Sequence, residues 1–203
     1  EDGLAYTYEL QGGISWDDGT PLTAEDVVFS TKVMLCPLTN NAQIRSNYTT
    51  VIKSVVVDKK NPLKFTMYAH DVNYTNADIF SELYIQQKSY WDPNGVLDNL
   101  SFEQIFATKF KETEALLEWF NGYNDGDNSY KPHLLQGLGA YQVTEWVAGQ
   151  YIIVEKKEKW WGVDDNSVYS IAYPDKIIFK IITDDAASYL ALKSEDIDVT
   201  TRI

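Results

Sequence analysis

Three pairs of adjacent aspartates are the residues best suited by type to catalysis. They are Asp17-Asp18, Asp164-Asp165 and Asp184-Asp185, and two carboxylates can act as acid and base in a glycosidase. All three pairs stand in turn or helix-cap contexts, where Asp is favoured because its side chain bonds nearby backbone groups. The sequence contains no Gly-x-Ser-x-Gly elbow and no phosphate-binding glycine loop. We therefore assign no catalytic residue.

Candidate metal ligands are few. The two histidines, His70 and His133, lie in polar or loop contexts with no partner at ligand spacing. The single cysteine, Cys36, excludes a disulfide within the chain and a cysteine-cluster metal site. The stretch 121–132 is rich in Asn, Asp and Gly, but Pro132 stands where an EF-hand needs its bidentate acid. We expect no metal site and no cofactor.

Aromatic residues are the one enriched class, at 14% of the chain. Trp160-Trp161, with Trp146 and Tyr151 upstream, could stack on a sugar or on a ligand side chain. Alternatively, the two adjacent indoles point to opposite faces of an extended segment and one of them enters a core. The second interpretation is favoured because tryptophan is largely buried on average. We therefore name no ligand-binding residue.

Composition and charge narrow the class of protein. The 203 residues are 44% apolar, which is enough for one large domain or two small ones. A net charge of −13 repels nucleic-acid phosphates and anionic lipid headgroups, so we expect no nucleic-acid partner. No apolar run reaches the ~20 residues that a membrane helix needs. The chain begins in the middle of a strand-like pattern and shows no leader, which indicates a piece of a longer protein.

The first 35 residues predict a strand, a turn and a helix. Residues 4–10 alternate between larger apolar and more polar side chains, which is the pattern of a strand with one buried face. A turn follows, in which Gly19 can adopt positive φ. Thr23 is then expected to cap a helix by accepting from the amide of Asp26, and a proline two residues after Leu35 ends that helix.

The middle of the chain predicts two strands and a long helix. Residues 51–57 and 63–68 are expected to form antiparallel strands joined by a polar loop. Ser101 and Gln104 resemble a capping box, and an apolar stripe from there to Phe120 indicates one helix. The Gly- and Asn-rich stretch that follows is the best candidate for a domain boundary.

The last third predicts a hairpin, a strand and a capped helix. Because strands and helices alternate and hairpins are present, we expect the α/β (α+β) class with a mixed sheet. The predicted elements are strands over 141–146, 151–156 and 176–182 and a helix over 186–192 capped by Asp184 or Asp185.

Three stretches in order resemble a known family. Residues 8–30 (YELQGGISWDDGTPLTAEDVVFS) closely resemble a hallmark stretch of the extracellular solute-binding proteins, family 5. Residues 137–146 (GLGAYQVTEW) with the later Trp160-Trp161-Gly162 are similar to that family's Gly-x-Gly-Pro-Tyr segment, its paired strand and its Tyr-Trp. Residues 174–198 resemble its strand–helix–Gly-Glu-Ile-Asp run. The chain departs from the family at Gln11, Ala140 and Glu195, which replace Arg, Pro and Gly.

The resemblance implies a type II periplasmic-binding-protein-like fold that is incomplete in this chain. Residues 1–136 would form the small extra lobe, and residues 137–203 would form part of the first ligand-binding lobe. The function implied is that of the extracytoplasmic substrate-binding component of an ABC transporter, which captures oligopeptides and delivers them to a membrane permease. The location implied is the periplasm, or the membrane surface as an anchored lipoprotein. The family's residue that holds a peptide's amino terminus belongs to a missing lobe, so no ligand contact is carried over.

Other functions stay open at this point. Within the binding class the ligand could be nickel, haem or an oligosaccharide instead of a peptide. From a different class, a secreted carbohydrate-active enzyme or a sugar-binding module would use the aromatic excess.

Overall fold

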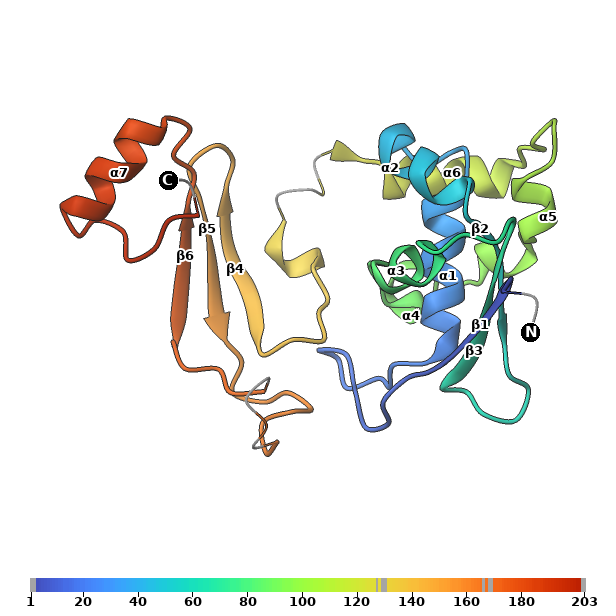
Figure 1. The fold of residues 1–203 in the computed structure, drawn as a ribbon, viewed down its shortest axis with the longest axis horizontal. Helices are drawn as coiled ribbons and strands as arrows, with labels where there is room; N and C mark the ends of the chain where they lie inside the picture. Colours follow the sequence, from blue (N-terminus) through green and yellow to red (C-terminus); the bar gives the residue numbers. More distant parts are fainter. Residues whose placement is uncertain (1–2, 127, 129–130, 166, 168–169, 202–203) are drawn as a thin grey trace.

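The computed structural model describes residues 3–126, 128, 131–165, 167 and 170–201. These residues form two parts, each built on its own three-stranded antiparallel sheet. We call residues 3–126 the N-terminal part and residues 131–201 the C-terminal part; the two sheets stand at opposite ends of the view in Figure 1. The expected class of helices combined with sheets is confirmed. The expected mixed sheet is not found among the described strands, whose pairs are all antiparallel because each sheet is built on a hairpin with one further antiparallel strand. The lobe boundary at residues 136/137 remains a prediction.

The N-terminal sheet has the order β1-β3-β2, with strands β1 (Ala5–Glu9), β2 (Ile52–Val57) and β3 (Lys64–Ala69). The predicted strands are therefore confirmed. Met67 is the central residue of the register, because it stands opposite both Tyr6 and Val55 and is only 1% exposed. Alternate residues of β3 turn their side chains into the core, as the period-two pattern indicated.

Helices cover this sheet. The central helix α1 packs against β2, and most of its residues are buried. The core formed by α1, the strands and the later helices includes Phe29, Leu35, Ile52 and Phe120, each at most 2% exposed. The helices are α1 (Ala24–Leu35), α2 (Ala42–Thr49), α3 (Asn76–Ser81), α4 (Lys88–Trp91), η1 (Val96–Asn99), α5 (Phe102–Ile105) and α6 (Glu114–Tyr123).

The expected long helix after Ser101 is wrong in its length. The capping box of Ser101 and Gln104 is present, but α5 ends after one turn and α6 starts separately behind the cap Thr113. Thr113 accepts from the amide of Leu116 at 3.3 Å. The sequence contains the reason, because Leu116 stands six positions after Phe110 and that offset leaves the apolar face of a single helix.

The expected cap of α1 is present as one half of a capping box. Thr23 occupies the N-cap position, its side chain accepts from the backbone amide of Asp26, and the Asp26 carboxylate accepts in return from the Thr23 amide at 2.9 Å. The same carboxylate also accepts from the Lys88 amide at 2.8 Å. Asp26 therefore ties the start of α1 to the start of α4.

We predict that Asp26→Ala lowers the free energy of unfolding by about 2 kcal/mol, because it leaves two backbone donors without their charged acceptor in a buried site. Thr23→Ala should cost less, about 1 kcal/mol, since it removes the cap hydroxyl but leaves both backbone donors of the Asp26 carboxylate in place. The exposed neighbour Glu25 is the control, and Glu25→Ala should stay within about 0.5 kcal/mol of wild type. Urea titration measures all three, and a larger cost for Thr23→Ala than for Asp26→Ala would contradict this assignment.

The C-terminal part has the strand order β4-β5-β6. Its elements are η3 (Pro132–Leu134), β4 (Tyr141–Val147), β5 (Tyr151–Lys156), β6 (Lys176–Lys180) and α7 (Asp185–Lys193). The predicted hairpin, strand and helix are confirmed. Of the two candidate caps, Asp184 is the N-cap, and its carboxylate accepts from the amide of Ala187 at 2.7 Å.

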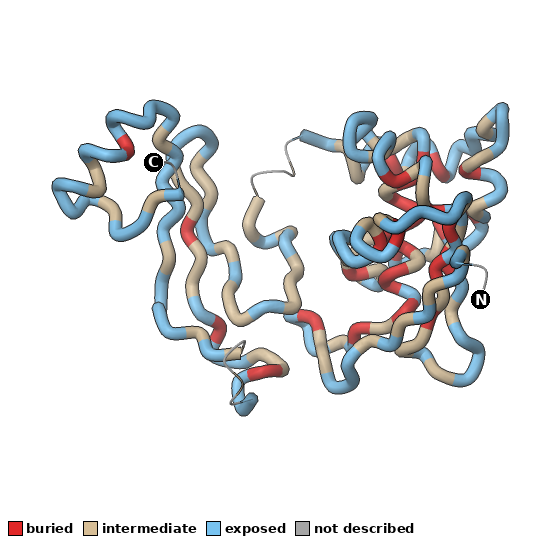
Figure 2. Tube along the Cα trace, in the orientation of Figure 1, coloured by how far each residue is buried: buried red, intermediate tan, exposed pale blue. Residues whose placement is uncertain are grey.

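Burial differs sharply between the two parts (Figure 2). Among the described residues of the C-terminal part, only Ile153, Lys157, Gly162 and Ser188 are buried. The apolar strand β6 is largely uncovered, with Ile178 50% and Phe179 54% exposed. Because side chains at adjacent strand positions point to opposite faces, both faces of this sheet are open at β6. The described C-terminal part therefore buries few side chains and leaves the apolar residues of its edge strand β6 exposed.

Candidate functional site at the joint between the two parts

The turn at residues 16–19 contains two adjacent aspartates, Asp17 and Asp18, whose side chains bind different parts of the molecule. It is closed by the Gly19 amide, which donates to the Trp16 carbonyl at 2.9 Å, and Gly19 has the positive φ that was expected. The partners of Asp18 belong to the N-terminal part: its carboxylate accepts from the Thr20 hydroxyl and from the Gln87 side-chain amide, each at 2.7 Å. Hydrogen bonds from the hydroxyl and amide of Thr20 lower the pKa of Asp18.

Asp17 instead reaches into the C-terminal part. One of its carboxylate oxygens forms an ion pair with the ammonium of Lys157, and the other accepts from the Gly137 amide at 3.0 Å. Lys157 Nζ also donates to the Gly139 carbonyl at 2.8 Å. The Lys157 side chain is 6% exposed and the Asp17 side chain 27%. We call Asp17, Gly137, Gly139 and Lys157 the joint.

The segment between Gly137 and β4 is held from several sides. The indole of Trp161 donates to the Leu138 carbonyl at 2.6 Å, and the Lys157 amide donates to the Ala140 carbonyl at 2.8 Å. The first two stretches that carried the family resemblance therefore meet at one place. Asp17 of the first stretch accepts a hydrogen bond from the backbone amide of Gly137 of the second and pairs with Lys157.

An aromatic pocket of about 480 Å³ lies beside the joint. Trp160, Trp161 and Tyr141 line it together with Gln11 from the N-terminal part. The expectation that the two indoles point to opposite faces is wrong: both line this pocket, with ring centroids 5.1 Å apart and planes at 71°. Both are half-buried, because the bond to Leu138 holds Trp161 while Trp160 folds back over the chain that follows it.

Asp165 and two serines form the polar end of the same pocket. The Asp165 carboxylate accepts from the Ser170 hydroxyl at 2.5 Å and from the Ser167 hydroxyl at 3.0 Å. The Ser170 hydroxyl is the main reason that the pKa of Asp165 is lowered. As expected for turn and cap residues, Asp18, Asp165 and Asp184 bind amides or hydroxyls close to them in sequence. Asp17 departs from this expectation, because it binds the Gly137 amide and the Lys157 ammonium.

Gly162 allows Trp160 to take its position. A Cβ added at Gly162 would lie 2.5 Å from the indole ring of Trp160, closer than side-chain atoms approach in proteins. We predict that Gly162→Ala expels the Trp160 indole from the pocket wall and lowers the melting temperature by about 5 °C, since a clash of this kind costs about 1–3 kcal/mol. Tryptophan emission should shift to longer wavelength. Gly126→Ala, where a Cβ would meet nothing within 4 Å, is the control.

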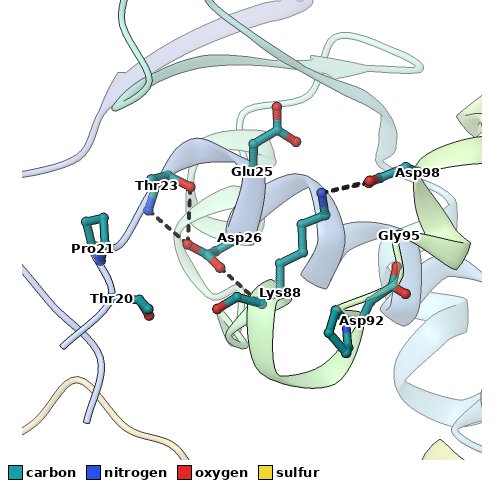
Figure 3. Close-up of a pocket in the computed structure, with 11 residues that line it drawn as sticks. Thr20, Pro21, Thr23, Glu25, Asp26, Lys88, Asp92, Gly95 and Asp98 are labelled. Carbon is teal, nitrogen blue, oxygen red and sulfur yellow. Dashed lines mark hydrogen bonds and ion pairs between the residues drawn. The ribbon is translucent and has the colours of Figure 1, made fainter. Parts of the chain in front are cut away.

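A second pocket, of about 440 Å³, lies between the start of α1 and the loop from α4 to η1 (Figure 3). Its carboxylates bind groups of the protein itself. Asp92 accepts from the amides of Val96 and Leu97 at 2.7 and 2.8 Å, and Asp98 pairs with Lys88 at 2.8 Å. Burial lowers the pKa of Lys88, but the hydrogen bond and charge of Asp98 outweigh it, so that pKa is raised overall. The carboxylates that line this pocket therefore stabilise the N-terminal part.

The candidate metal ligands, the single cysteine and the helices provide no further site within the described residues. Within the described ranges, no three His, Cys, Asp or Glu side chains are grouped so that they could hold a metal ion. Asp127, which belongs to the acidic 121–132 stretch, lies outside the described residues. His70 packs its ring against Phe106, with centroids 4.9 Å apart. Burial raises the pKa of the Cys36 thiol to about 11. Among the described helices, none combines the length and the apolar character needed to cross a membrane.

Comparison with known proteins identifies relatives along the whole chain. A family model described as bacterial extracellular solute-binding proteins, family 5 Middle, matches residues 1–203. The oligopeptide-binding protein AppA of Bacillus subtilis is 26% identical over 199 residues, which cover 98% of this chain and 30% of AppA. The periplasmic murein peptide-binding protein MppA of Escherichia coli is 25% identical over 212 residues, covering 98% of this chain and 33% of MppA.

Solved structures of solute-binding proteins also match this chain. The structure of AppA from Bacillus subtilis in complex with a nonapeptide matches with a TM-score of 0.62 and 27% identity, covering 97% of this chain and 32% of AppA. NikZ from Campylobacter jejuni, in complex with Ni(L-His), matches with a TM-score of 0.64 and 24% identity, covering 97% of this chain and 31% of NikZ. The chain thus spans about a third of the length of these relatives. Its fold is the expected incomplete type II periplasmic-binding-protein-like fold, and the chain belongs to the bacterial extracellular solute-binding proteins, family 5.

Proposed function

We propose that this chain is a segment of the extracytoplasmic substrate-binding component of an ABC importer, which captures oligopeptides and delivers them to a membrane permease. The observation that carries the proposal is the match of the family over residues 1–203, together with relatives whose names give oligopeptides and murein peptides as their ligands. The structure of AppA in complex with a nonapeptide supports the same ligand class.

The open C-terminal sheet supports a binding site completed by further chain. A protein of this kind gains affinity by closing lobes around a ligand, which removes the ligand's charged and peptide groups from water and replaces their hydrogen bonds. Here the sheet β4-β5-β6 presents apolar side chains on both faces, and the segment spans about a third of its relatives. We therefore place the ligand between this sheet and chain outside the segment, and the closed form would be the one that the permease recognises.

The proposed role includes no chemical step and no cofactor. Its support is that the aspartates considered as catalytic carboxylates serve structural contacts: Asp17 in the joint, Asp18 in the turn, Asp165 with its serines and Asp184 at a helix cap. We also propose an extracytoplasmic location, periplasmic or at the membrane through a lipid anchor, because the matched relatives include proteins named as periplasmic.

Isothermal titration calorimetry with mixed di- to hexapeptides tests the proposal. The longer protein that contains this segment should bind with saturable heat, whereas the 203-residue chain alone should show none, because one face leaves the peptide's groups solvated. Mass spectrometry of ligands that copurify with the longer protein tests the alternatives of nickel, haem and oligosaccharide. Micromolar peptide binding by the 203-residue chain would show that the site lies within it. Turnover of a chromogenic glycoside would overturn the non-enzymatic role.

A further inference from the structure

The joint contains an ionic contact between segments that are 140 residues apart in sequence. The main hydrophobic core is built from residues 4–123, and the described C-terminal part buries few side chains of its own. Apolar packing of that core therefore holds the N-terminal part together without extending into the sheet β4-β5-β6. The orientation of the C-terminal part depends on what joins it to the turn at Asp17.

We propose that Asp17 and Lys157 form a latch that fixes the C-terminal part in one orientation relative to the N-terminal part. A carboxylate bound at one oxygen would still allow rotation about that bond. Asp17 uses both oxygens, one on the Lys157 ammonium and the other on the Gly137 amide. Two attachment points from one rigid planar group define a direction as well as a distance.

The C-terminal side of the latch is itself held in place. Lys157 Nζ also binds the Gly139 carbonyl at 2.8 Å, and the Lys157 amide binds the Ala140 carbonyl at 2.8 Å. Lys157 follows directly on β5, so a force on its ammonium passes to the central strand of the C-terminal sheet. The Lys157 side chain is only 6% exposed, which makes the loss of its carboxylate partner costly and weakens the screening of the pair by salt.

The chain offers two matched controls. Asp18 is the adjacent aspartate in the same turn, but its partners Thr20 and Gln87 belong to the N-terminal part. Lys156 is the adjacent lysine, and its partner Asp175 belongs to the C-terminal part, at 2.7 Å. Asp18→Asn and Lys156→Met therefore remove the same charges without touching a contact between the parts.

Double electron–electron resonance tests the latch in the 203-residue chain. Spin labels are placed at the exposed positions Lys60, in the β2–β3 loop, and Ala148, in the β4–β5 turn. The buried Cys36 should stay unlabelled at neutral pH, and a sample without the two introduced cysteines checks this. The unmodified latch should give one narrow distance distribution, and Asp17→Asn and Lys157→Met should each widen it at least twofold.

The controls decide the outcome. Asp18→Asn and Lys156→Met should leave the width of the distribution unchanged. Distributions for Asp17→Asn and Lys157→Met that are no wider than those of the controls would overturn the latch. Circular dichroism at the same temperature checks that each variant is folded; if Lys157→Met does not fold, the nearly isosteric Asp17→Asn alone carries the test. The distance measurement uses no peptide, so its result is independent of whether the proposed function is correct.

Discussion

Amide protons of β5 should exchange with solvent at least about 100-fold faster than those of β3 in the 203-residue chain, after correction for intrinsic rates. Each strand is the middle one of a three-stranded antiparallel sheet, so both have hydrogen-bonded neighbours on each side. They differ in burial: Phe65, Met67 and Ala69 of β3 are in the core, whereas Ile153, at 9% exposed, is the only residue of β5 that counts as buried. Local opening is therefore cheaper in β5 by about 3 kcal/mol.

Hydrogen exchange followed by mass spectrometry measures this difference on peptides from the two strands. The comparison isolates side-chain burial because the number of paired neighbours is the same. Equal protection of β3 and β5 would mean that the hydrogen-bonded ladder and the joint suffice to stabilise the C-terminal part, contrary to the expectation. In the longer protein of the proposed function, the difference should shrink as further chain covers β4-β5-β6.

Local chemistry made much of the fold predictable from the sequence. The strand, turn and helix in the first 35 residues, the hairpin and the Asp184 cap all depend on neighbouring residues, and all were found. Residues 102–120 form two helices where their apolar content predicts one, because Leu116 stands six positions after Phe110 and so lies off the apolar face of α5. At the start of α1 the Thr23 cap follows from neighbouring residues, whereas the second partner of the Asp26 carboxylate, the Lys88 amide, is 62 residues away and has no local signal.

The joint was not predictable in the same way. Lys157 stands in the run Lys156-Lys157-Glu158-Lys159, which is typical of an exposed charged surface, and only Lys157 is buried there. Its partner Asp17 was assigned to a turn, which is correct but incomplete. One signal was available: the two segments that the joint connects both belong to stretches that resemble the family. A resemblance of that kind indicates positions under constraint without saying whether the constraint is ligand binding or the orientation of lobes.

The uncovered sheet has a consequence for the behaviour of the chain in solution. We expect the 203-residue chain to self-associate at micromolar concentration, because Ile178 and Phe179 of β6 and Tyr189 and Leu190 of α7 are each at least 50% exposed. The strand β6 is an edge of its sheet, and an apolar edge strand can pair with another copy. Sedimentation velocity over a range of concentrations measures this association.

Phe179→Lys should weaken the self-association at least 10-fold, since the aromatic side chain contributes about 1.5–3 kcal/mol when it is buried between copies. Val56→Lys is the matched control, because Val56 lies on β2, an edge strand of the N-terminal sheet, and is 53% exposed against 54% for Phe179. In the longer protein we expect Phe179→Lys to lower the stability of the fold. If further chain covers β6, Phe179→Lys buries an unpaired charge and lowers the free energy of unfolding by about 3 kcal/mol, while Val56→Lys stays within about 0.5 kcal/mol. A Phe179→Lys variant as stable as wild type in the longer protein would show that this face remains in contact with solvent there, and that the ligand-binding lobe is completed elsewhere.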